Sequence, residues 1–132
     1  MIDRGLWALT AACVAATFWF SFVAPAPGAD LFPNADKAGH AIAYFATTLS
    51  FLFAAVWRPG RGLGRFASVG RWFPLAAIAG GAMIEILQDM TARTAQAYDL
   101  VAEVIGIAAV VAIHELVRWR MTSRVARLDP RA

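Results

Sequence analysis

Most of the residues that could do chemistry in this chain fall into three short groups. The groups are Asp36, Lys37, His40 and Tyr44; Glu85, Gln88 and Arg93; and Asp99 with Glu103. Carboxylates beside an imidazole can transfer protons, whereas lysine and arginine can hold a phosphate or a carboxylate. We therefore take His40 and Glu85 as the candidate acid/base pair and the other members of the three groups as candidate ligand-binding residues.

The spacing within each group predicts a helix with one polar face, because residues three or four positions apart share a side of a helix. Asp36, His40 and Tyr44 follow this spacing, and so do Glu85 and Gln88. The third group repeats it. Each of three helices should therefore carry one polar stripe.

Four apolar segments carry or precede these groups, at about residues 5–24, 38–57, 72–90 and 99–119. Each approaches the roughly 20 residues that a helix needs to cross about 30 Å of hydrocarbon. Of the 132 residues, 60% are hydrophobic and 16% are charged, which is more apolar surface than a small soluble domain can cover. We predict an all-α polytopic membrane protein, a single domain over residues 1–132 that forms a four-transmembrane-helix bundle.

The first apolar segment has two interpretations. Val23-Ala24-Pro25-Ala26, behind the basic Arg4, has some similarity to the end of a cleaved signal peptide. The apolar run is longer than the core of a typical signal peptide. We therefore favour a retained helix.

Arginines are concentrated between the second and third segments and in the tail, residues 120–132. Because Lys and Arg resist translocation, both regions and both termini are expected on the cytoplasmic side of a bacterial cytoplasmic (inner) membrane, which the chain crosses several times. The three polar groups then face the outer leaflet. The arginines alternate with Trp and Phe, which favours contact with anionic lipid over nucleic acid, and no nucleic-acid partner is predicted.

The polar groups also share a depth in the membrane. At 1.5 Å of rise per residue, His40, Glu85 and Glu103 each lie within roughly 10 Å of the outer interface. Ionisable side chains are costly inside a membrane, so those present usually face a cavity or one another. Glycines at Gly80-Gly81 and Gly106 offer places where helices can approach closely.

The order and placement of these residues resemble the VanZ-like family of small bacterial membrane proteins. The residues that carry the resemblance are Asp36, Lys37, His40, Tyr44, Glu85, Gln88, Arg93, Asp99 and Gly106. The family usually has Asn four residues after the Asp, whereas this chain has Glu103, which puts its ligand specificity in question. The family is named for low-level teicoplanin resistance, and the resemblance implies that role without defining a reaction.

Two function classes follow from the residues and the resemblance. The first is a membrane protein that binds or acts on a cell-envelope lipid or peptide head group, such as a lipid-linked or D-Ala-D-Ala-type cell-wall precursor, with teicoplanin resistance as the implied phenotype. The second is a small intramembrane hydrolase or transferase that uses His40 and Glu85. Whether the chain is an enzyme stays open, as does association with a second copy or another membrane protein. Membrane lipids are the expected partners.

Two other interpretations use the same residues. They can form an internal ion-pair network that fixes helix register, for example Lys37 with Asp36 or Asp89, in a purely structural accessory subunit. They can also coordinate a divalent cation through His40 and the carboxylates. The sequence has no HExxH motif and no paired-His spacing, so neither a metal nor another cofactor is predicted.

Overall fold

A computed structural model describes residues 2–23, 31–55, 64–90 and 97–128 of the chain. This part of the protein is all-α, with four helices and no strand, as predicted. The helices are α1 (Ile2–Phe22), α2 (Ala35–Ala55), α3 (Gly64–Asp89) and α4 (Ala97–Leu128).

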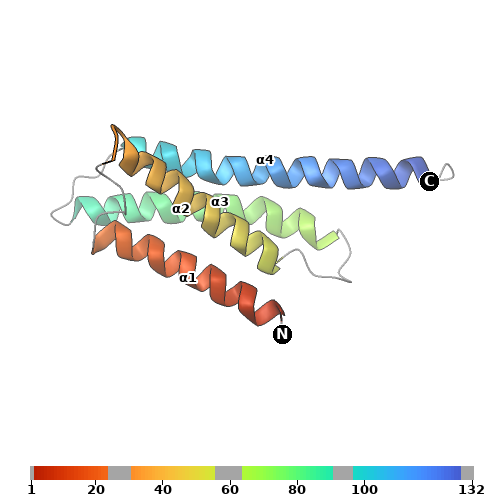
Figure 1. Ribbon diagram of the computed structural model, residues 1–132, viewed down its shortest axis with the longest axis horizontal. Coiled ribbons are helices and arrows are strands. Elements are labelled where there is room, and N and C mark those ends of the chain that lie inside the picture. The colour runs from red at the N-terminus through yellow and green to blue at the C-terminus, as the bar shows by residue number, and fades with distance from the viewer. Residues whose placement is uncertain (1, 24–30, 56–63, 91–96, 129–132) are drawn as a thin grey trace.

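The helices lie side by side along the long axis of the molecule and alternate in direction (Figure 1). The N-terminus of α1 and the C-terminus of α4 consequently point toward the same end. α2 packs most extensively against α4 and next against α1, whereas α3 packs mainly against α4. The contact between α2 and α4 is therefore the central one in the bundle.

Three of the helices are long and apolar enough to cross a membrane, over Arg4–Phe22, Ala35–Ala55 and Ala97–Met121. Within the described residues α3 is not among them, and Glu85, Gln88 and Asp89 make its last turns polar. It nevertheless lies alongside the other helices. Three apolar helices are thus consistent with a membrane protein, and a membrane crossing by α3 stays a prediction.

The bundle buries charged side chains and exposes large apolar ones. Glu85, Asp99 and Glu103 are buried, while Trp19 and Trp72 are more than half exposed. Water would leave such an exposed apolar surface prone to association, whereas lipid solvates it. The distribution is the one expected for a helical membrane protein.

α4 continues beyond the expected span. Its 32 residues extend for about 48 Å at 1.5 Å per residue, against a hydrocarbon core of about 30 Å. The segment from 120 to 128, predicted as part of a basic tail, is helical because it contains no glycine or proline, and Pro130 follows it. The basic turns therefore continue α4 past its apolar part.

Gly106 allows α4 to approach α2 closely. A Cβ atom at this position would overlap the backbone carbonyl of Ala41 and lie 3.0 Å from the amide nitrogen of Phe45. Gly80 on α3, in contrast, has nothing within 4 Å of the corresponding position. Of these two glycines, only Gly106 is required by helix packing.

Gly106→Ala should destabilise the bundle by about 1–3 kcal/mol, the usual cost of overpacking. The free energy of unfolding in detergent measures this effect. Gly80→Ala is the matched control and should leave stability unchanged or raise it by up to about 1 kcal/mol, because Ala favours helix more than Gly does. Equal stability of Gly106→Ala and wild type would contradict the close approach of α2 and α4.

Candidate functional site

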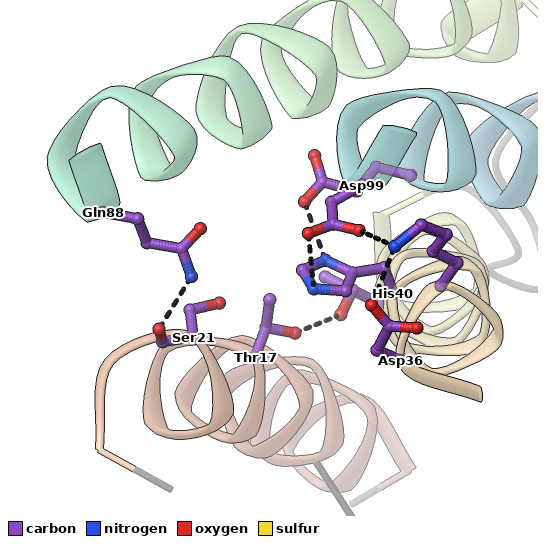
Figure 2. Close-up of polar contacts among 9 residues, drawn as sticks. Thr17, Ser21, Asp36, His40, Gln88 and Asp99 are labelled. Atoms are coloured by element: carbon purple, nitrogen blue, oxygen red, sulfur yellow. Dashed lines mark hydrogen bonds and ion pairs between the residues drawn. The ribbon is translucent and has the colours of Figure 1, made fainter. Parts of the chain in front are cut away.

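The polar stripes of α2 and α4 meet at His40. Its Nδ1 atom lies 3.2 Å from Oε1 of Glu103, and its Nε2 atom lies 3.9 Å from Oδ2 of Asp99. Figure 2 shows the imidazole beside Asp99, with Asp36 on the neighbouring turn of α2. The half-buried ring therefore lies between two carboxylates that are one helical turn apart on α4.

Glu85 brings α3 to the same place. One nitrogen of His40 and one carboxylate oxygen each from Glu85 and Glu103 all lie within 4.8 Å of one another. Both glutamates are buried. Three helices thus supply an imidazole and two carboxylates to one small region, which is the convergence that the shared depth predicts.

Glu103 occupies space that Gly81 leaves open. A Cβ atom at Gly81 would overlap Oε2 of Glu103 and would lie 3.1 Å from the hydroxyl oxygen of Tyr44. Glu103 is only 1% exposed, and its Oε2 has no hydrogen-bond partner among the described residues. Leaving a buried acceptor unsatisfied is costly, so this oxygen is suited to a ligand.

Lys37 links α2 to α4 beside this region. Its ammonium nitrogen lies 2.8 Å from Oδ2 of Asp36 and 3.2 Å from Oδ1 of Asp99. The Lys37–Asp36 pair expected for an internal network is therefore present, and Asp99 is a further partner. An anionic ligand at Lys37 would have to compete with two carboxylates.

Gln88, one of the candidate ligand residues, contacts α1. The side-chain amide of Gln88 donates a hydrogen bond of 2.7 Å to the backbone carbonyl of Ser21, on the far side of the region in Figure 2. This contact ties α3 to α1. Arg93 lies outside the described residues.

α1 contributes residues that the sequence reasoning left out. A cavity of about 360 Å³ lies between α1 and α2, and its lining includes Thr17 and Ser21 together with His40 and Tyr44. The signal was present in the sequence, because Thr10, Thr17 and Ser21 are seven and four positions apart and so share a helical face. Thr10 and Ser21 are indeed buried.

Comparison with protein-family models, curated proteins and solved structures found no match. The resemblance to VanZ-like proteins accordingly stays a prediction. The chemistry open to the site follows from its geometry: an imidazole among carboxylates can move protons, accept hydrogen bonds from a ligand or coordinate a cation.

A double-mutant cycle between His40→Ala and Glu103→Ala should give a coupling energy of about 1–3 kcal/mol, because the pair is shielded from water. Unfolding in detergent measures the four free energies. His114 and Glu115 form the control pair, since His114 Nδ1 lies 3.5 Å from Glu115 Oε1 and the Glu115 side chain is 51% exposed. Its coupling should stay below about 1 kcal/mol; a His40–Glu103 coupling no larger than that would show that the buried contact is not formed.

Proposed function

We propose that this chain binds a lipid or lipid-linked precursor of the cell envelope, with the head group at His40 and Glu103 and the hydrocarbon chain between α1 and α2. The observation that carries the proposal is the cavity of about 360 Å³ whose wall includes His40 and Tyr44. Its volume falls within the range of about 300–1,000 Å³ that is common for small-ligand sites. A largely apolar cavity with His40 and Tyr44 in its wall suits an amphiphile.

The walls of the cavity suit the hydrocarbon part of the ligand. Phe20 on α1 and Ile42 and Ala43 on α2 are among its lining residues. Both helices are apolar enough to cross a membrane, so the cavity would lie at the depth of the acyl chains. An apolar chain of a membrane lipid is the occupant that this environment favours.

The polar end of the site suits a head group that donates hydrogen bonds. Glu103 presents a buried oxygen without a partner among the described residues, and an amide N–H or a sugar hydroxyl can supply the missing bond. Lys37 is already paired with Asp36 and Asp99. A peptide or sugar head group therefore fits better than a bare phosphate held by Lys37.

The biological setting of this proposal rests on charge and on the family resemblance. The arginine-rich regions and both termini would lie in the cytoplasm, so the polar cluster would face the outer leaflet of the bacterial cytoplasmic membrane. Lipid-linked peptide precursors of the cell wall are exposed there. Resistance to teicoplanin would follow if binding changed how the antibiotic meets its peptide target.

Ala43→Phe should weaken binding of a polyprenyl-linked muropeptide that ends in D-Ala-D-Ala by at least tenfold, because the new ring fills the cavity. Native mass spectrometry of the detergent-solubilised protein measures the bound fraction. Ala79→Phe is the matched control and should bind as wild type does, since Ala79 is exposed on α3. The cavity would not hold the hydrocarbon chain if the soluble muropeptide bound as tightly as the lipid-linked one. The same conclusion would follow if Ala43→Phe bound the lipid-linked muropeptide as tightly as wild type does.

An intramembrane hydrolase or transferase is the second candidate. The observation that favours it is the position of the His40 ring between Glu103 and Asp99, since a carboxylate that orients an imidazole supports general acid/base catalysis. Glu85 would be the second proton-transfer group, as the sequence suggests. In this alternative the same cavity would hold the lipid part of the substrate.

Glu85→Gln should abolish any teicoplanin-resistance phenotype in an expressing bacterial host without lowering the amount of protein in the membrane. Glu115→Gln, the same change at an exposed position of α4, should have no effect. His40→Gln separates the two candidates, because an enzyme would lose the phenotype completely whereas a binding protein would keep part of it. An unchanged phenotype in Glu85→Gln would count against both.

A further inference from the structure

The region around His40 contains the donor set of a metal site. A nitrogen of His40 and one oxygen each from Glu85 and Glu103 lie within 4.8 Å of one another. Two ligands that are each about 2.1 Å from an ion lie roughly 3–4 Å apart, depending on the coordination geometry. His40 Nδ1 and Glu103 Oε1, at 3.2 Å, already have such a separation, and the Glu85 oxygen lies within 4.8 Å of the ligand atoms of His40 and Glu103.

The second oxygen of Glu103 points independently to a bound ligand. Glu103 is only 1% exposed, and this oxygen has no hydrogen-bond partner among the described residues. Keeping a buried carboxylate oxygen unsatisfied in an apolar bundle is costly. A cation at the junction of α2, α3 and α4 would compensate it and would draw the two glutamates together.

A further carboxylate lies on the other side of the His40 ring, where it could orient a metal-binding histidine. Such residues commonly direct their other ring nitrogen toward a carboxylate, which fixes the orientation of the ring. If Nδ1 binds the ion, Nε2 faces Oδ2 of Asp99 at 3.9 Å. Lys37 in turn holds Asp99 through a contact of 3.2 Å, so the orienting carboxylate is itself fixed in place.

The donor atoms select the class of ion. Calcium and magnesium prefer oxygen ligands alone, whereas an imidazole nitrogen beside carboxylates suits a divalent transition metal such as zinc. Two glutamates would neutralise the charge of the ion while His40 stays neutral. Three protein ligands also leave at least one coordination position for water or a head group.

We propose that His40, Glu85 and Glu103 form a binding site for one divalent transition-metal ion of the zinc type, oriented by Asp99. This site goes beyond the lipid-binding function and does not depend on it. The residue types allow such a site, but sequence spacing does not identify its ligands, because they come from three helices and no two of them share a short motif.

The test uses the full chain in detergent, with any purification tag removed and metals stripped by a chelator. Zinc alone is titrated by calorimetry. One Zn²⁺ should bind per chain, Glu103→Gln should weaken binding at least tenfold, and Glu115→Gln should leave it unchanged. Magnesium at the same concentrations should not compete.

X-ray absorption at the zinc edge keeps the proposal testable if Glu103→Gln does not fold. The spectrum of the zinc-loaded wild type should contain one imidazole and further oxygen ligands at about 2.0–2.2 Å. His114→Gln should keep the imidazole contribution, whereas His40→Gln should lose it.

Three results would overturn the metal site: no stoichiometric zinc binding, wild-type affinity in Glu103→Gln, or a wild-type spectrum without an imidazole. Because no lipid-linked ligand enters these assays, each of these results leaves the test of the lipid-binding function untouched. Conversely, loss of muropeptide binding does not change the zinc titration. The two failures are therefore distinguishable.

Discussion

The contact between His40 and Glu103 is the interaction on which the rest of the bundle depends. A carboxyl group that is 1% exposed among apolar helices is tolerated only when neighbouring groups stabilise it, whether it is charged or protonated. The imidazole provides part of this stabilisation at 3.2 Å. Gly81 supplies the space that the carboxylate needs, and Gly106 lets α4 come close enough to α2 for the two side chains to meet. The two glycines therefore provide the space in which the His40 and Glu103 side chains meet.

A second link fixes the register of the same two helices. Lys37 reaches from α2 to Asp99, one turn before Glu103 on α4, so α2 and α4 are joined at two successive turns. α1 is held differently, through the amide of Gln88 on the carbonyl of Ser21 and through Thr17 facing Thr47 at 3.5 Å. The looser packing of α1 against α2 leaves the cavity that the lipid-binding proposal uses.

The features that could be predicted from the sequence are those that depend on local periodicity. Apolar runs of membrane length gave the helices, and the spacing of Asp36, His40 and Tyr44 gave a polar face that does meet α4. Which side chains of different helices come into contact depends on the distance and rotation between the helices, and no single segment of sequence encodes these. For this reason the contact of Gln88 with Ser21 and the polar stripe of α1 that ends at Ser21 were not predicted.

The space shared by Gly81 and Glu103 links the evolution of two positions on different helices. With a long acidic side chain at 103, a methyl group at 81 would overlap the carboxylate and force it to move. A shorter side chain at position 103, such as Asn, would relax that restriction. Replacements at the two positions should therefore be inherited together, with the larger side chain on one helix matched by the smaller on the other.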